Sequence, residues 1–282
     1  MRGTRVEELL AFDLALGCGK IPETDEAARP ADAPALFPNA CGDAEGATRA
    51  PLTNAREGTE AVPRALRLIG FDEAGRGALA GPIVVGCVHI PPELLTDREA
   101  VLRLLPGVDD SKALSPKARD AAFVCVAAST RWAFGCASAA EIDAIGIVPA
   151  AERAARRAYR RLSVSCDLMV FDRGLSLGEP VPLDDESVVR SPRSDRARVP
   201  LSVAFTRGDT RSLHVAAASL VAKVTRDRIM QRLDRSFPGF DLGKHKGYGT
   251  QRHFRALAER EPSPIHRRTF LRGLEKARSQ SC

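Results

Sequence analysis

The sequence predicts a mixed α/β fold, in which helices cover a single sheet. Three observations predict it: short runs rich in β-branched residues come first, helical and strand patterns then alternate, and helical patterns follow. This order is typical of a layered α/β structure. With 282 residues, of which 44% are apolar, the chain is long enough to bury a core.

The ordered part of the chain is predicted to begin near residue 65. Apolar, β-branched runs predict five strands, at 66–72, 82–90, 130–138, 166–172 and 200–206. Glycine and proline between the first two predict a turn. Residues 149–162 have a proline in the first turn and good helix formers after it, so they predict a helix. Residues 211–235 carry an apolar stripe and predict a second, longer helix, which ends at Phe237.

Two segments interrupt this order. Residues 1–64 are rich in Ala, Pro, Gly and Asp, and only 6–16 have the pattern of a short amphipathic helix. Such a composition buries too little apolar surface to offset the entropy of ordering, so we predict a disordered extension before a single domain at 65–282. Residues 175–199 are polar and unpatterned, and they predict an inserted surface loop.

Charge and cysteine content narrow the class of protein. Residues 1–66 carry 7 Lys and Arg against 11 Asp and Glu, whereas residues 67–282 carry 35 against 25. A basic body favours a polyanionic partner, although a merely basic soluble protein remains an alternative. No apolar run approaches the roughly 20 residues that span a bilayer, so no membrane is expected. Seven cysteines without a CxxC pair indicate buried thiols in a cytoplasmic protein.

Acidic residues stand where the predicted strands end. Asp72 and Glu73 end the first strand, Asp172 ends the fourth, and Asp209 precedes the long helix. Strand ends on one edge of a sheet converge on a crevice, where gathered carboxylates would repel one another. A pair of hard divalent cations such as Mg²⁺ resolves this repulsion and can activate water. The alternative is that these acids are ordinary caps and solvated loop residues.

Two further loops carry chemistry. The glycines of Gly75-Arg76-Gly77 allow the backbone to approach a ligand closely, and such a loop suits a sugar hydroxyl and its phosphate. A tight hairpin turn is the alternative. Tyr248 lies among basic residues in HKGYGT (245–250), which suits stacking on a sugar or base beside phosphate contacts. Packing at a helix junction is the alternative for this ring.

Taken together, these motifs resemble those of bacterial ribonuclease HII. The resemblance covers about residues 66–275 and rests on five stretches in the family's order: GFDEAGRG (70–77), DDSKALSP (109–116), GDTRSLHVAAASLVAKVTRDR (208–228), HKGYGT (245–250) and PSPIHRRT (262–269). It implies a ribonuclease H-like fold, with a five-stranded mixed sheet flanked by helices and a C-terminal helical segment. Residues 65–282 would then be the catalytic domain.

The resemblance also implies an activity. The protein would be a cytoplasmic, monomeric endonuclease that uses Mg²⁺ or Mn²⁺, two ions per site during catalysis. It would hydrolyse the RNA strand of RNA–DNA hybrids and incise 5′ of single ribonucleotides in duplex DNA. The products would carry 3′-hydroxyl and 5′-phosphate ends. A role in replication and ribonucleotide excision repair follows from these substrates.

The family's functional residues carry over onto this sequence. Its catalytic metal ligands match Asp72, Glu73, Asp172 and Asp209. Its substrate-binding residues match Gly75, Arg76 and Gly77, which read the ribose 2′-hydroxyl, and Tyr248, which stacks on the next deoxyribose. Lys112 and Lys223 look like phosphate-contacting residues, although a solvated helix face is an alternative for Lys223. Ser219 could reach the bound strand, but small residues at helical spacing are more typical of close packing.

One motif departs from the family's pattern. The third acidic motif usually reads Asp-Gly-Asn, but here it reads Asp172-Arg173-Gly174. We expect Asp172 to remain a ligand, while the geometry of the turn after it is open. Three other interpretations stay open: a ribonuclease HIII-like enzyme with poor action on single ribonucleotides, a catalytically dead hybrid-binding module, and a basic structural protein of the nucleoid.

Overall fold

The protein is built around a five-stranded mixed sheet with the strand order β3-β2-β1-β4-β5. The computed structural model describes residues 2–17, 66–108, 114–178 and 200–279. The strands are β1 (Leu68–Ala74), β2 (Ile83–His89), β3 (Arg131–Ala137), β4 (Leu168–Asp172) and β5 (Leu201–Phe205). The three strands β1, β2 and β3 pair antiparallel, whereas β1, β4 and β5 pair parallel. The predicted α/β class is confirmed, and each strand overlaps its predicted range.

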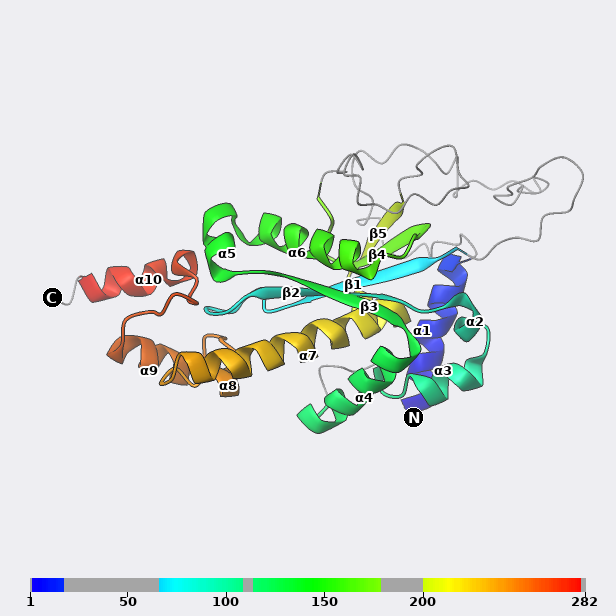
Figure 1. Cartoon of the computed structure of the whole chain (residues 1–282), viewed down its shortest axis with the longest axis horizontal. Helices are drawn as coiled ribbons and strands as arrows, with labels where there is room; N and C mark the ends of the chain where they lie inside the picture. The colour runs from blue at the N-terminus through cyan, green and yellow to red at the C-terminus, as the bar shows by residue number, and fades with distance from the viewer. Residues whose placement is uncertain (1, 18–65, 109–113, 179–199, 280–282) are drawn as a thin grey trace, which may run out of the picture.

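Helices cover both faces of this sheet (Figure 1). One face packs against α7 (Leu213–Ser236) and the other against α6 (Ile147–Leu162), the two helices that the sequence pattern predicts. Four further helices were not predicted individually: α2 (Pro92–Leu95), α3 (Arg98–Leu104), α4 (Pro116–Ser129) and α5 (Ala139–Ile145). None of the helices in the described ranges is long and apolar enough to cross a membrane.

Small residues let α7 lie directly on the sheet. A Cβ at Gly70 of β1 would lie 2.3 Å from the carbonyl carbon of His214, and one at Gly86 of β2 would lie 2.4 Å from the Ala218 oxygen. Alternate residues of a strand point to opposite faces, so Asp72 faces α7 as Gly70 does. The close approach therefore fixes the early turns of α7 against the polar end of β1.

The N-terminal helix differs from the prediction of a disordered extension. Residues Arg2–Gly17 form α1, whose apolar side chains lie in the core beside α7 and α3: Val6, Leu9, Leu10 and Leu16 are buried. Asp13 is fully buried as well, and its Oδ2 accepts hydrogen bonds from the backbone N–H of His214, at 3.0 Å, and from His214 Nδ1, at 2.6 Å. The helical pattern at 6–16 is therefore confirmed, while the packing of this helix in the core, which burial against distant elements stabilises, was not predicted.

The two described residues that flank the rest of the predicted extension lie together. The backbone N–H of Leu66 donates to the carbonyl oxygen of Gly17 at 3.0 Å. The prediction for residues 18–64 lies outside the described residues, as does most of the predicted loop at 175–199. Of that loop the structure describes 175–178, where Leu175 is buried.

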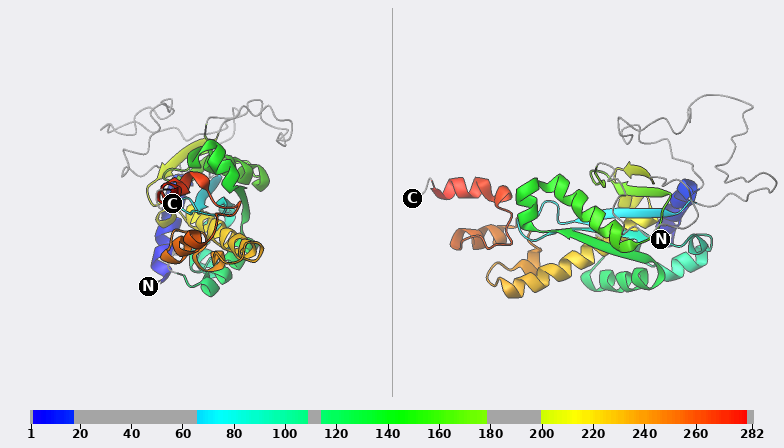
Figure 2. Two further views of the ribbon diagram at one scale, coloured as in Figure 1. Left: turned by 90° about the vertical axis from the view of Figure 1, so that its left-hand side faces the viewer. Right: turned by 45° about the horizontal axis from the view of Figure 1, so that its top comes forward.

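A helical segment follows α7, as the resemblance implies. It contains α8 (Leu242–His245), α9 (Gln251–Glu259) and α10 (Arg268–Ser279). Figure 2 shows α9 and α10 at one end of the molecule and α1 near the other. Buried Met230 and Leu257 share a small core with Ala80, which follows β1. The segment therefore packs against the loop that leaves the acidic end of β1.

Candidate active site

Strand register brings the first and third acidic motifs side by side. Phe71 of β1 pairs with Phe171 of the parallel strand β4, so the next residues, Asp72 and Asp172, lie on adjacent strands and face the same side. The predicted convergence of carboxylates at one sheet edge is thus what the topology produces. Because β1 also continues to Ala74, Asp72 lies within the strand rather than at its end.

Asp72 is the most perturbed carboxylate of this edge. Its side chain is 4% exposed, and its Oδ1 accepts the backbone N–H of Glu73 at 2.7 Å. Burial, together with the negative charges of Glu73 and Asp172, raises the pKa of Asp72 to about 8, although the Ser219 hydroxyl donates to the carboxylate and opposes the shift. Ser219 therefore supports an acid, which its spacing on the helix did not reveal.

Asp209 is held beside Asp172 by backbone geometry. The N–H of Gly208 donates to Asp172 Oδ1 at 2.7 Å, and a Cβ at Gly208 would lie 3.2 Å from the Asp172 Cα. Asp209 follows in a short 3₁₀ helix (Gly208–Thr210) and is largely buried. A Cβ at this distance would be tighter than ordinary contact, so glycine favours the close approach, and its N–H ties the segment that carries Asp209 to Asp172.

The donors at this edge fit a hard divalent cation in chemistry. All four are carboxylates, the oxygen ligands that Mg²⁺ and Mn²⁺ accept. Burial first, and then the charges of Glu73 and Asp172, raise the pKa of Asp72, and a cation would favour its ionised form. Within the described ranges, no three His, Cys, Asp or Glu side chains lie close enough together to hold a metal ion as they stand. Glu73 instead accepts a hydrogen bond from Arg76 Nη1 at 2.9 Å. This bond uses only the Oε1 oxygen of Glu73.

The departure at Arg173-Gly174 is compatible with the site. Gly174 has φ of +89°, a conformation that favours glycine. The Leu175 N–H donates to the backbone carbonyl oxygen of Asp172 at 3.2 Å and closes the turn. Arg76 Nη2 also donates to the Gly174 oxygen at 2.8 Å. Asp172 thus stays at the end of β4. Through its two hydrogen bonds, Arg76 links the turn that follows Asp172 to the Glu73 carboxylate.

Tyr248 lies on a loop that is hydrogen-bonded to the segment following Gly77. The backbone carbonyl oxygen of Gly247 accepts the N–H of Leu79 at 2.8 Å, and the backbone carbonyl oxygen of Tyr248 lies 3.0 Å from His253 Nδ1. Tyr248 is 39% exposed, and one side of its ring lies against the Arg226 guanidinium. The backbone of this loop is anchored while its ring is accessible.

Of the two lysines predicted to contact phosphate, the structure describes only Lys223. Lys112 lies outside the described residues. Lys223 is on α7, one turn after Ser219, and its Nζ lies 2.6 Å from Asp227 Oδ1 in an ion pair along the helix. Its role in phosphate binding stays a prediction. In the structure its ammonium group is paired with Asp227.

Sequence reasoning missed two buried arginines near this site. Arg226 and Arg267 lie within the family-like stretches 208–228 and 262–269, where the sequence pattern alone indicates no role for them. Both side chains are almost completely buried, and both donate to backbone carbonyls between residues 75 and 82. A buried arginine is rare without partners, so their occurrence inside the motifs was the available signal.

The fold class is that of the ribonuclease H-like nucleases. The ribonuclease H2 from Pyrococcus horikoshii OT3 is 26% identical and superposes with a TM-score of 0.57, over 75% of this chain and 98% of that one. The chain belongs to the ribonuclease HII family, whose model matches residues 69–273. The ribonuclease HII of Chloroflexus aggregans is 43% identical over 209 residues, 74% of this chain and 88% of the relative. A ribonuclease HII of Thermus thermophilus is 42% identical over 208 residues, 73% of this chain and 87% of the relative.

Family membership defines the general activity. The protein is an endoribonuclease of the ribonuclease H type, which cleaves the RNA strand of RNA–DNA hybrids and needs a divalent metal ion. The interpretation as a ribonuclease HII is confirmed. The family assignment disfavours a nucleoid structural protein and a ribonuclease HIII-like enzyme.

Proposed function

We propose that this enzyme also incises 5′ of single ribonucleotides in duplex DNA, by a two-metal-ion mechanism that leaves 3′-hydroxyl and 5′-phosphate ends. The observation that carries the proposal is the joining of three parts at one sheet edge. The acids at Asp72 and Asp172 lie side by side, loop 75–77 leaves the same strand as Asp72, and the loop of Tyr248 is hydrogen-bonded to the segment after it.

The four acids would hold Mg²⁺ or Mn²⁺. Asp72 and Asp172 would be the central ligands, and Glu73 and Asp209 would complete the two sites. When bound, the ions activate water and stabilise the leaving oxygen. The protein contributes the geometry: Gly208 fixes Asp172 through its N–H, and Ser219 orients Asp72. Arg76 holds Glu73 in place through the hydrogen bond from its Nη1.

Loop 75–77 and Tyr248 would select the ribonucleotide. A 2′-hydroxyl is the group that distinguishes one ribonucleotide from the surrounding DNA, so the enzyme needs a reader for it. Gly75 has φ of +92°, and a Cβ there would lie 1.9 Å from Arg226 Nε, so glycine lets this buried backbone lie against the guanidinium. Gly77 is exposed, and a Cβ there would meet nothing within 4 Å, so its backbone is open to a ligand. The accessible ring of Tyr248 would stack on the next deoxyribose, while Lys112 and Lys223 would contact phosphates.

The metal assignment is tested with an end-labelled RNA–DNA hybrid, incubated with Mg²⁺, with Mn²⁺ or with EDTA. We expect metal-dependent cleavage by the wild type. Asp172→Asn should abolish cleavage but leave hybrid binding, measured by fluorescence anisotropy, largely intact, because the phosphate contacts remain. Asp120→Asn is a matched control, since Asp120 is an exposed acid paired with Arg228 away from the site. Unchanged cleavage by Asp172→Asn would contradict the assignment.

A further inference from the structure

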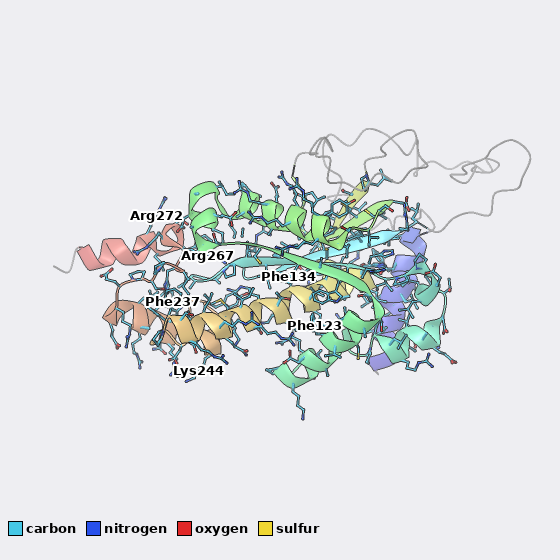
Figure 3. All side chains as sticks on the ribbon, in the orientation of Figure 1. Phe123, Phe134, Phe237, Lys244, Arg267 and Arg272 are labelled. Atoms are coloured by element: carbon cyan, nitrogen blue, oxygen red, sulfur yellow. The ribbon has the colours of Figure 1, made fainter. Side chains whose placement is uncertain are left out.

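Two buried guanidinium groups lie beneath loop 75–77. Arg226, on α7, is 1% exposed, and Arg267, just before α10, is 0% exposed. Figure 3 labels Arg267 where the C-terminal segment meets the end of the sheet. Two segments that are far apart in sequence, α7 and the residues before α10, therefore each place one arginine beneath loop 75–77.

Arg267 donates to three carbonyl oxygens of the loop and the residues after it. Its Nη2 lies 2.7 Å from the Gly75 oxygen, its Nη1 2.8 Å from the Arg76 oxygen, and its Nε 3.1 Å from the Gly81 oxygen. A guanidinium group is a rigid planar fork, so three such bonds fix the relative positions of the three carbonyls. A lysine, with one ammonium nitrogen, cannot reproduce this arrangement.

Arg226 connects the same loop with Tyr248. Its Nε and Nη2 donate to the oxygens of Pro82 and Ala80, at 3.0 and 3.2 Å. Its guanidinium carbon lies 5.2 Å from the centroid of the Tyr248 ring, within cation–π range. A Cβ on Gly75 would lie 1.9 Å from Arg226 Nε, so this loop backbone rests directly on the guanidinium.

This arrangement costs stability. Among the described residues, neither guanidinium makes an ion pair with a carboxylate, and burial together with the charge of Arg226 lowers the pKa of Arg267 to about 9. Burying a charge is expensive, and here backbone carbonyls compensate for the loss of water. A role in fixing the loop, rather than in stability, accounts better for two such groups at this position.

We propose that Arg226 and Arg267 are positioning residues that set loop 75–77 relative to Tyr248, and so determine which phosphodiester bond is cut. This inference rests on the proposed function of that loop and ring. A duplex with one ribonucleotide can be cut only when its single 2′-hydroxyl lies against loop 75–77, so an enzyme with a displaced loop cannot cleave it. A long hybrid offers a 2′-hydroxyl at every position, so a displaced loop still finds a substrate but cuts at scattered positions.

The test compares Arg226→Lys and Arg267→Lys with Arg228→Lys as the matched control. Arg228 is on the same helix but exposed, paired with Asp120. For each protein, kcat/KM is measured on a duplex with one ribonucleotide and on a long hybrid, and the cut sites on the hybrid are mapped. The ratio of the two kcat/KM values does not depend on how much of the protein is folded, so a purely structural role would not change it.

We expect the ratio of single-ribonucleotide to hybrid cleavage to fall about tenfold or more in both buried-site variants, because a displacement of about 1 Å can cost a large factor in rate. The cut sites on the hybrid should spread, and Arg228→Lys should match the wild type. An unchanged ratio with unchanged cut sites would overturn the inference. Should both lysine variants fail to fold, Arg226→Gln and Arg267→Gln remove the buried charge while keeping a hydrogen-bond donor, and they must show the same fall in ratio.

Failure of the proposed function would look different. A wild-type enzyme that cuts hybrids but not the single-ribonucleotide duplex would contradict the proposed function. The positioning role would then be decided by the cut sites on the hybrid alone. Scattered sites in the two variants would support it, and wild-type sites would overturn it.

Discussion

Replacing Asp72 by Asn should change how the stability of the metal-free protein depends on pH. Asp72 is almost fully buried, lies beside the charges of Glu73 and Asp172, and has its pKa raised to about 8 from 3.8. The folded protein therefore binds this proton more tightly than the unfolded chain does. Its contribution to stability is fully present below pH 3.8 and is lost as the pH rises through about 8.

The magnitude follows from the linkage relation. Each pH unit between the unfolded and folded pKa values removes about 1.4 kcal/mol from the free energy of unfolding. From about pH 6.5 to 8, the metal-free wild type should lose about 1.5 kcal/mol more than Asp72→Asn, because the folded group is partly ionised near the end of this range. The asparagine keeps the size of the side chain but has no proton to lose.

Urea unfolding in EDTA at several pH values measures this difference. Buried histidines such as His266, whose pKa is lowered to about 4 by burial and by His253, titrate equally in both proteins and cancel. Saturating Mg²⁺ should remove the loss in the wild type, since a cation stabilises the ionised carboxylate. Parallel stability curves for the two proteins between pH 6.5 and 8 would contradict a raised pKa at Asp72.

Three further predictions concern the substrate loop, the N-terminal helix and the close packing of α7. Tyr248→Ala should reduce cleavage of single-ribonucleotide duplexes more than that of long hybrids, and equal effects in steady-state assays would refute its role as a junction reader. Leu9→Ala should destabilise the protein by about 2–5 kcal/mol in urea unfolding, because Leu9 is buried in the core; a change near zero would contradict the packing of α1. Gly86→Ala should lower the midpoint of thermal unfolding, since its Cβ would lie 2.4 Å from the Ala218 oxygen, whereas Gly77→Ala, which meets nothing within 4 Å, should not.

Periodicity predicted the elements that are regular within themselves. The five strands are short apolar runs, and α6 and α7 carry long helical patterns, so local sequence was sufficient for them. Helix α1 was not recognised as part of the folded protein because its stability comes from contacts with α7 and α3, which are distant in sequence. Its Asp13 meets His214 across 201 residues, a pairing that no local pattern contains.

The acids of the site were predictable because strand ends and carboxylates are both visible in sequence. The roles of the arginines were not predictable, because Arg226 and Arg267 bind backbone carbonyls 144 to 192 residues away. Every residue has a backbone carbonyl, so the residue type does not indicate such a partner. The support that Ser219 gives to Asp72 was hidden for a similar reason. It depends on how closely α7 approaches the sheet, which Gly70 and Gly86 determine.

The most direct test of the account is cleavage of a labelled DNA duplex that carries one ribonucleotide, with Mg²⁺, with Mn²⁺ and with EDTA. We expect incision on the 5′ side of the ribonucleotide, with a 3′-hydroxyl end, in either metal and none in EDTA. Cleavage of long hybrids without incision of this duplex would contradict it.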